Sequence, residues 1–329
     1  MKPFEFDIYK KLKKLIENEK PKKILFNLNV SGGKDSMSLL HAFYQISNDK
    51  KNKIKEKYTY IVQHFDHKTR HGESKKDALF VEEYCKSKGI PFFLNEFSSK
   101  ETKNFQSAAR LWRKKESKTL LLKLLKDSAC ETFYTVTAHH LRDKVESIFL
   151  NILRGTGMDG LRGMKACDTS QRFFRPLLDT SYEDLLSYTK EFSIPFREDS
   201  SNKESYYARN YLRHNIFPLL PKINKAYEKN ILNLSQIVDS QFKKEDEHDN
   251  KEDYALIINK ETQEDDVYRF IKRKTHLNFD LNSNQVKNIL HEAKLLIHSK
   301  TKTKKILTLK SGHTIELYST LKKVFLLVI

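Results

Sequence analysis

ILFNLNVSGGKDSMSLLHAFYQI, residues 24–46, decides the fold. Its first seven residues, 24–30, are mostly apolar and predict a buried strand. SGGKDS (31–36) follows directly, and the apolar residues of 36–46 then recur with helical spacing. A buried strand, a glycine turn and a helix in immediate succession predict one unit of an α/β sheet.

The same alternation continues on the carboxyl side of this stretch. Further strands are predicted at 58–65, 91–97 and 132–138. Helices are predicted between them, one closed by Gly89, and another after the last strand, ended by Gly155. We therefore expect an α/β fold, a parallel sheet with helices on both faces, whose ligands bind at the carboxyl ends of the strands.

The second half of the sequence has a different character. Helices are predicted at 181–192 and 204–220, with Pro218 and Pro221 marking a break, and the strongly polar stretch 242–253 suits a solvated linker. Helical patterns at 264–275 and 283–294 precede two or three strands in 304–329, with Ser311–Gly312 as a hairpin turn. The prediction is a catalytic domain over 1–215, a helical linker over 216–250 and a small α+β domain over 251–329.

Composition narrows the classes of protein. Lys and Arg number 61 against 43 Asp and Glu, which gives a net charge of +18 and favours a polyanionic partner, nucleic acid first, over a mere lysine-rich composition. The three cysteines are far apart and form no C-x-x-C, so a disulfide scaffold, a zinc ribbon or an iron–sulfur cluster is not expected. The amino terminus lacks an apolar signal core, and no apolar run approaches the roughly 20 residues of a membrane span. We expect a soluble, cytoplasmic protein without membrane contact.

The turn SGGKDS has the chemistry of a nucleotide loop. Gly32 and Gly33 let the backbone bend tightly, and the N–H groups at the start of the helix form a cradle for an anion. Ser31 and Ser36 add hydroxyl groups, Lys34 adds a positive charge, and Asp35 suits a site where a metal ion stands between it and phosphate. The Walker pattern does not fit, because Leu28 stands where it needs glycine. An ordinary glycine turn is the alternative interpretation.

Two polar clusters follow other predicted strands. HFDH (64–67) closes the second strand and TAHH (137–140) closes the fourth, so both lie on the same sheet edge as SGGKDS. Asp143 and Glu146 follow TAHH at helical spacing and share one face. Carboxylates aimed at a triphosphate commonly act through Mg²⁺. Capping or surface roles remain the alternative for each histidine taken alone.

Together these motifs resemble a known family. SGG-x-DS after the first strand is similar to the loop of the N-type ATP pyrophosphatases. Seven further motifs occur in order: H-x-D-H, S-A-A-R-x-x-R (107–113), T-A-H-H-x-x-D-x-x-E, L-R-G-T-G-M-D-G-L-R-G-M (153–164), R-P-L-L-D (175–179), R-E-D-S-S-N (197–202) and Y-A-R-N-x-x-R-H (207–214). Over residues 24–220, and more loosely beyond, the chain resembles the tRNA(Ile)-lysidine synthetase family.

The resemblance implies an activity. Such enzymes use ATP to adenylate C2 of the wobble cytidine, position 34, in the tRNA(Ile) with a CAU anticodon. Free L-lysine then displaces AMP, and the codon read changes from AUG to AUA. ATP and Mg²⁺ are the implied cofactors, and a shorter carboxyl-terminal region than in longer family members is implied too. The oligomeric state stays open, a homodimer included.

The chemistry of the side chains suggests residue roles, and the resemblance adds that the arginines lie near the anticodon and ATP. Asp35, Asp143 and Glu146 are the catalytic candidates, and Asp35 and Asp143 the Mg²⁺ candidates. The predicted tRNA contacts are Arg110, Arg113, Arg209 and Arg213, with a run of Lys300, Lys302, Lys304 and Lys305 along the RNA backbone. Structural ion pairs or a solvated loop are the alternative roles, and Trp112 suits the core better than a base platform.

One stretch departs from the family pattern. The family's Ala-Asp-Asp-Gln is Leu141-Arg142-Asp143-Lys144 here, which leaves a single acid and lets Arg142 and Lys144 face solvent or RNA. A tRNA thiolase with the same kind of loop is one alternative function, although it generally needs the cysteine pairs that are missing. A catalytically silent RNA-binding module is the other.

Overall fold

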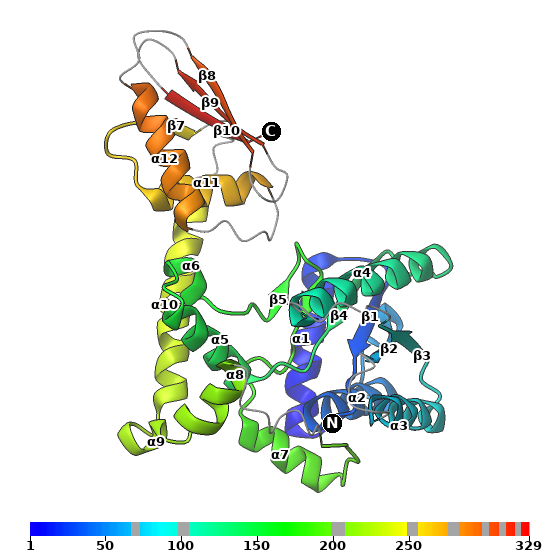
Figure 1. The fold of residues 1–329 in the computed structure, drawn as a ribbon. Coiled ribbons are helices and arrows are strands. Elements are labelled where there is room, and N and C mark those ends of the chain that lie inside the picture. Colours follow the sequence, from blue (N-terminus) through cyan, green and yellow to red (C-terminus); the bar gives the residue numbers. More distant parts are fainter. Residues whose placement is uncertain are drawn as a thin grey trace. The chain divides into compact units, whose positions relative to one another are not determined.

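The computed structural model contains two compact units, Met1–Lys243 and Lys244–Ile329. Figure 1 labels helices and strands of both units. The described residues are 1–66, 73–97, 105–198, 208–248, 256–275, 283–297, 303–308, 314–319 and 324–328.

The first unit is built on a six-stranded sheet of order β3-β2-β1-β4-β6-β5. Its strands are β1 (Ile24–Asn29), β2 (Tyr58–Asp66), β3 (Phe92–Glu96), β4 (Thr132–Val136), β5 (Cys167–Asp168) and β6 (Phe173–Phe174). All neighbouring pairs are parallel except β5 with β6, and Leu28 of β1 lies between Val62 and Val136. The predicted parallel sheet is confirmed. The sequence did not predict β5 and β6, because a two-residue strand has no periodicity.

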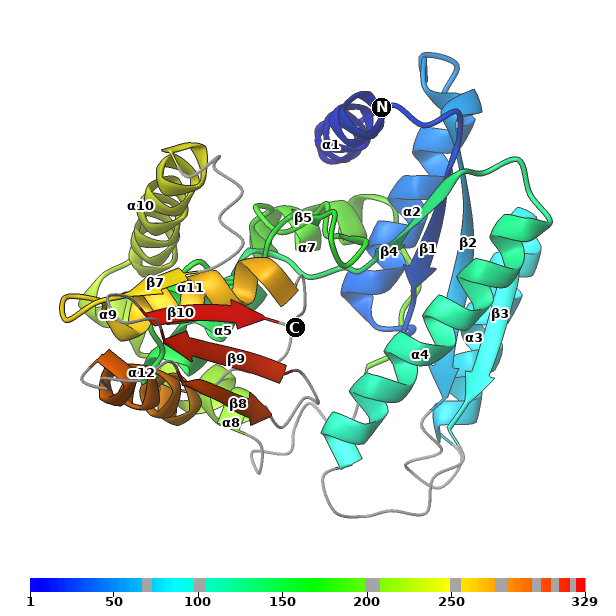
Figure 2. The ribbon, with the colours of Figure 1, turned by 90° about the horizontal axis from the view of Figure 1, so that it is seen from above.

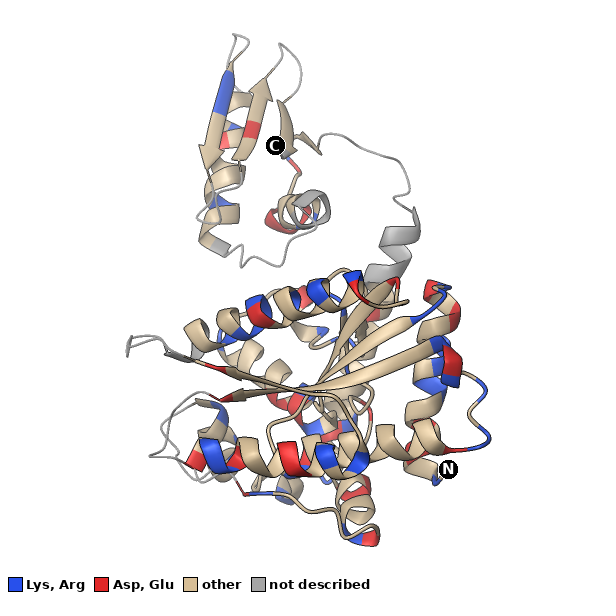
Figure 3. Ribbon diagram, turned by 90° about the vertical axis from the view of Figure 1, so that its right-hand side faces the viewer, with Lys and Arg blue, Asp and Glu red and all other residues tan. Residues whose placement is uncertain are grey.

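Helices cover both faces of this sheet, as predicted (Figures 2 and 3). One face packs against α1 (Pro3–Glu19), α2 (Lys34–Asn48), α3 (Glu73–Lys88) and α7 (Tyr182–Glu191). The other packs against α4 (Phe105–Lys126). Alternation along β1 explains the two cores, since Phe26 joins the first and Leu25 the second.

A helical layer completes the first unit. It contains α5 (Leu141–Leu153), α6 (Met158–Leu161), α8 (Ala208–Tyr211), a π-helical turn (Leu212–Ile216), α9 (Leu220–Ile223) and α10 (Tyr227–His248), which belongs to this unit up to Lys243. Val145, Leu212 and Phe217 form its core, and Tyr227 and Ile231 of α10 pack against them. Residues 216–243 therefore belong to the first unit, although the sequence assigned them to a linker.

The predicted helix 204–220 is interrupted. Its described part comprises α8, the π-helical turn and the first residue of α9, while 204–207 lie outside the described residues. Pro218 follows the π-helical turn and cannot donate a helical hydrogen bond, which agrees with the break there.

The second unit is a small α+β fold, as predicted. Its antiparallel sheet has the order β7-β10-β9-β8 and is made of β7 (Leu256–Ile258), β8 (Lys304–Thr308), β9 (Thr314–Ser319) and β10 (Val324–Val328). The helices α11 (Glu264–Thr275) and α12 (Ser283–Ile297) pack on it through a core that includes Val267, Ile289 and Leu317. The predicted turn Ser311–Gly312 and residues Lys300 and Lys302 lie outside the described residues. No helix in the described ranges combines the length and apolarity that a membrane span requires.

Candidate functional site

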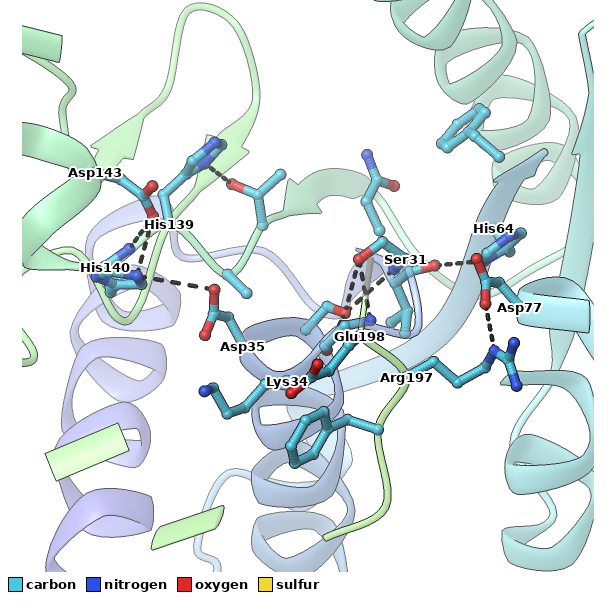
Figure 4. A pocket seen from close by; sticks show the side chains of 18 of the residues that line it. Ser31, Lys34, Asp35, His64, Asp77, His139, His140, Asp143, Arg197 and Glu198 are labelled. Atoms are coloured by element: carbon cyan, nitrogen blue, oxygen red, sulfur yellow. Dashed lines mark hydrogen bonds and ion pairs between the residues drawn. The ribbon is translucent and has the colours of Figure 1, made fainter. Parts of the chain in front are cut away.

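A cavity of about 720 Å³ opens at the carboxyl ends of β1 and β4 (Figure 4). The loop after β1 lines one side, and residues 137–143, after β4, line another. Chain segments far apart in the sequence also contribute Arg113, Tyr182, Arg197 and Arg213. The cavity lies where the parallel sheet predicts a ligand site.

The loop SGGKDS is held in a fixed turn by its own side chains. Gly32 has a φ of 89°, and an added Cβ there would lie 3.4 Å from Cγ2 of Val81. The Ser36 hydroxyl donates to the carbonyl of Gly33 at 2.9 Å, and the amide of Ser31 donates to Ser36 Oγ at 3.2 Å. The turn then delivers the chain into the amino terminus of α2, which favours a bound anion. The six predicted ATP-binding residues thus form one structure, five of them lining the cavity, with Gly32 supplying the bend.

The ammonium group of Lys34 is held by aromatic side chains. Its Nζ donates to the Tyr182 hydroxyl at 2.9 Å and lies 5.1 Å from the centre of that ring and 5.5 Å from the Phe196 ring. Lys34 forms no ion pair with a carboxylate of the described part of the chain, so its charge is available to a phosphate group.

A segment that approaches the loop from the chain after α7 was not assigned a role from the sequence. The amide of Arg197 donates to the carbonyl of Gly32 at 3.0 Å, and its guanidinium pairs with Asp77 of α3. Figure 4 shows this pair beside the loop, with Glu198 also at the cavity. The motif R-E-D-S-S-N was a signal for this segment, but no spacing rule links Arg197 to Asp77, 120 positions earlier.

Asp35, His140 and Asp143 converge on the opposite side of the loop. Nε2 of His140 lies 3.8 Å from Oδ2 of Asp35 and 3.6 Å from Oδ2 of Asp143. Asp143 also caps α5, since its carboxylate accepts from the amide of His140 at 3.0 Å. The two predicted Mg²⁺ candidates, Asp35 and Asp143, thus lie on either side of one imidazole nitrogen.

The environments of the two carboxyl groups differ. Burial and, to a smaller degree, the charge of Asp143 raise the pKa of Asp35, against the opposing effect of His140. Burial also acts to raise the pKa of Asp143, but His140, His139 and Arg209 outweigh it and lower that pKa. Two acids with opposite shifts at one site are typical of functional carboxylates.

The residues present fit a Mg²⁺ ion. Oδ1 of Asp35 is buried without a hydrogen-bond partner, although the side chain as a whole is 40% exposed toward the cavity. Mg²⁺ is commonly bound by one or two carboxylates together with substrate phosphates. In the described residues no cluster of three or more His, Cys, Asp or Glu side chains could hold a metal ion without such a phosphate.

Glu146 takes a different position from the other two acids. Its side chain is fully buried, and it accepts from Nε of Arg209 at 2.8 Å and from Nε of Arg213 at 2.8 Å. Asp143 accepts from the same two guanidinium groups at 3.4 and 3.2 Å. Glu146, which is not among the residues that line the cavity, thus anchors both arginines. Their predicted role in tRNA binding would use the guanidinium edges that stay exposed.

The two histidines of the fourth strand end differ as well. Both line the cavity, but His140 is buried, whereas His139 is half-buried and forms a 2.8 Å hydrogen bond between its Nδ1 and the Thr137 hydroxyl. Burial, with the charges of Arg175, Arg209 and Arg110, lowers the pKa of His139 to about 4. His64 at the second strand end hydrogen-bonds the carbonyl of Val30 at 2.8 Å and so fixes the loop entry, while His67 is outside the described residues.

The structure also places the other predicted residues. Of the lysine run, Lys304 pairs with Glu316 at 2.8 Å and Lys305 pairs with Glu292. Arg113 lines the cavity, while Arg110, three residues earlier on α4, does not. Trp112 packs at 5.4 Å from the Phe65 ring and 4.8 Å from the Phe97 ring, as expected of a core residue. Arg142 pairs with Glu228 at 3.1 Å and Glu183 at 3.4 Å.

Comparison with known proteins shows the family of the chain. Residues 4–220 match the PP-loop domain family. A tRNA(Ile)-lysidine synthase from Petrotoga mobilis is 33% identical over 243 residues, which is 72% of this chain and 73% of that protein. The chain belongs to the PP-loop family of tRNA(Ile)-lysidine synthases.

Other relatives in this PP-loop family are longer. The tRNA(Ile)-lysidine synthase from Bacillus licheniformis is 35% identical over 217 residues, which cover 64% of this chain and 43% of that protein. The chain thus spans less than half the length of several relatives that it matches. Among solved structures, the U34-tRNA thiolase NcsA from Methanococcus maripaludis, with its [4Fe-4S] cluster, has the same fold. The TM-score is 0.52 and the identity 16%, over 72% of this chain and 79% of that one.

Proposed function

We propose that this PP-loop protein is an ATP-dependent tRNA(Ile)-lysidine synthase. It would join L-lysine to C2 of cytidine 34 in the tRNA(Ile) with a CAU anticodon and release AMP and pyrophosphate. One observation carries the proposal: Asp35, with a buried unpartnered oxygen, stands in a glycine loop opposite Asp143 at the edge of a parallel sheet. The names of the relatives supply the substrate class.

The loop residues would bind and orient ATP. The amides at the start of α2 and the hydroxyl groups of Ser31 and Ser36 suit the phosphate groups, and Lys34 adds a positive charge from its aromatic cradle. Mg²⁺, when bound between Asp35, Asp143 and the phosphates, would supply charge neutralisation as pyrophosphate leaves. The cytidine oxygen would attack the α-phosphorus of ATP, and the C2 position would thereby acquire a good leaving group, AMP.

The second step needs a neutral amine on lysine. An ammonium group has no lone pair, so a carboxylate close to it must accept a proton before the amine attacks C2. Asp35 and Asp143 are the candidates, because both side chains line the cavity. Glu146 would act at a distance by anchoring Arg209 and Arg213.

Labelled-lysine transfer tests the proposal directly. The full chain, ATP and Mg²⁺ are incubated with ¹⁴C-lysine and an unmodified tRNA(Ile) transcript with a CAU anticodon, and acid-precipitable label is counted. The expected result is label that requires ATP and is absent with an elongator tRNA(Met) transcript, together with one pyrophosphate per lysine. Pyrophosphate release that needs no tRNA, or label that fails to appear with active tRNA(Ile), would overturn it.

A thiolase is not favoured by the positions of the cysteines. Cys85 and Cys130 are buried, on α3 and before β4, and Cys167 is half-buried on β5. Burial raises the pKa of Cys85 to about 12 and also raises the pKa of Cys167, so neither supplies a ready thiolate.

A further inference from the structure

Four cationic side chains gather beside the cavity, and the nucleotide loop uses none of them. Arg110, Arg113 and Lys114 lie on the amino-terminal half of α4, and Arg175 follows β6. We call these four residues the α4–β6 cluster. Three are exposed and Arg175 is half-buried, so the cluster forms a surface feature.

The hairpin of β5 and β6 ties the cluster together. Lys114 Nζ donates to Oε1 of Gln171 in the hairpin turn at 3.3 Å. Arg175 donates from one terminal nitrogen to the carbonyl of Lys165 at 2.9 Å and lies 5.0 Å from the Phe173 ring centre. Its Nε is buried and has no hydrogen-bond partner. The guanidinium is therefore fixed in direction by a carbonyl and an aromatic ring.

Within the described residues, none of these four cations forms an ion pair with a carboxylate. The charge of Asp168 acts on Lys114 and Arg175 without an ion pair, and hydrogen bonds within its own turn hold the Asp168 side chain. One of its oxygens accepts from the Ser170 hydroxyl at 2.7 Å and from the amide of Gln171 at 3.0 Å. Packing like charges together costs free energy, so an uncompensated cluster is typical of a surface that meets an anion.

Mutual repulsion in the cluster is visible in its pKa values. Partial burial, and then the charge of Arg110, lower the pKa of Arg113 and Lys114. Burial and Arg110 also lower the pKa of Arg175, and Asp168 acts in the opposite direction on Lys114 and Arg175. The same charges reach the cavity, since Arg175 and Arg110 help to lower the pKa of His139. Arg113 itself lines the cavity. The cluster therefore extends from the cavity wall outward over α4 and the hairpin.

We propose that the α4–β6 cluster binds backbone phosphates of the RNA strand on either side of the nucleotide that enters the cavity. The inference rests on the proposed function and adds Lys114 and Arg175, which no motif assigns to RNA. Phosphate is favoured over a base, because the cluster offers separate cations on two elements rather than a paired donor and acceptor. ATP is the weaker candidate, because the loop and Lys34 already supply a phosphate site on another wall.

The salt dependence of RNA affinity tests this site. Lys114→Gln, Arg175→Gln and Arg175→Lys are compared with Lys123→Gln, which removes one exposed charge from the carboxyl-terminal part of the same helix. The dissociation constant of an unmodified tRNA(Ile) transcript is measured by filter binding between 50 and 300 mM KCl. Circular dichroism checks that each variant is folded.

Each lost phosphate contact should lower the slope of log affinity against log salt by about 0.7–0.9. Lys114→Gln and Arg175→Gln should therefore weaken binding by roughly 3–10-fold near 100 mM salt, whereas Arg175→Lys should retain the slope and Lys123→Gln should leave both quantities unchanged. The dissociation constant of ATP should stay within twofold in all four.

Two outcomes separate the site from the proposed function. If both glutamine variants keep the wild-type slope, the phosphate site is refuted, whatever lysine transfer shows. If the slopes fall as expected but the wild type transfers no lysine, the RNA site stands and the proposed reaction is lost.

Discussion

The carboxylates of Asp35 and Asp143 lie beside one nitrogen atom, Nε2 of His140, at 3.8 and 3.6 Å. The two acids come from neighbouring strand ends, and the imidazole of a buried histidine stands between them. Two carboxylates this close disfavour each other's charge, so a cation between them is stabilising. A Mg²⁺ ion with its bound triphosphate would serve that purpose during the reaction.

We expect Asp35→Asn to reduce the rate of lysine transfer at least about 100-fold. A neutral amide can neither compensate the charge of Mg²⁺ nor accept a proton from the lysine amine. The affinity for tRNA should change by less than twofold. Label transfer and filter binding on the same preparation measure both. Asp7→Asn, which removes an exposed acid of α1 paired with Lys10, is the matched control and should behave as wild type. Near-normal turnover of Asp35→Asn would reject the assignment of the site.

Gly32→Ala should weaken ATP binding by about tenfold or more, since the position has a φ of 89°, which strains any residue with a side chain. The turn would relax, and the amides at the start of α2 would leave the phosphate groups. Isothermal titration with a non-hydrolysable ATP analogue and Mg²⁺ gives the dissociation constant. Gly157→Ala is the control, because its φ is −75° and nothing lies within 4 Å of the added methyl group. Equal affinities in the two variants would show that the loop does not hold the triphosphate.

Local patterns in the sequence predicted most of the elements. The predicted strand 24–30 and helix 264–275 agree with β1 and α11 to within one residue. In both segments the apolar residues follow the pattern of the element, and the ends are clear. The nucleotide loop was predictable for the same reason, since its residues are contiguous. The polar clusters at the ends of the second and fourth predicted strands could also be predicted to lie near the loop, because parallel strands end at the same edge of a sheet.

Long-range pairings could not be predicted. The sequence offers no rule by which Arg209 meets Glu146, 63 positions earlier, or by which Arg197 reaches Asp77. Both pairs form across elements that only the folded chain brings together. The hairpin of β5 and β6 was not predicted, because a two-residue strand is too short to show alternation of apolar and polar residues. The contacts of Arg175 with this hairpin were therefore not predicted either.

Acid should destabilise the first unit in part through His139, whose pKa is about 4 in the folded chain against an ordinary value of 6.5. Between these values the unfolded chain binds a proton that the folded chain does not, so stability falls as pH falls from 6.5 to 4. In that window His139 contributes up to one proton to the uptake on unfolding, which sets the slope of the unfolding free energy against pH. His139→Gln should remove this contribution from the slope. His214→Gln, at an exposed position on the same cavity, is the control.

Urea unfolding followed by tryptophan fluorescence suits this measurement, because Trp112 is the single tryptophan of the chain and lies in the first unit. The titration covers pH 4 to 7.5 in steps of half a unit. An unchanged slope in His139→Gln would mean that the folded chain protonates this histidine at its ordinary pKa.

Removing the charge of Glu146 should destabilise the first unit, because its fully buried carboxylate holds both Arg209 and Arg213. Glu146→Gln leaves an amide facing two guanidinium groups, and we expect a loss of about 2 kcal/mol in unfolding free energy. Arg213→Gln should lower the unfolding free energy less, by about 1 kcal/mol. The Arg213 side chain is 35% exposed, so water can solvate part of the guanidinium group and weakens its ion pair. The double variant should lose less than the sum, with a coupling energy of about 1 kcal/mol.

The same variants separate anchoring from chemistry. If Glu146 only positions the arginines, Glu146→Gln and Arg213→Gln should impair lysine transfer to similar degrees, mainly through the KM for tRNA, and the double variant should be little worse than either one. Additive losses in kcat would instead place the Glu146 carboxylate in contact with the substrate. Steady-state label transfer at varied tRNA concentration, with Trp112 fluorescence confirming that each variant is folded at the assay temperature, distinguishes the two cases.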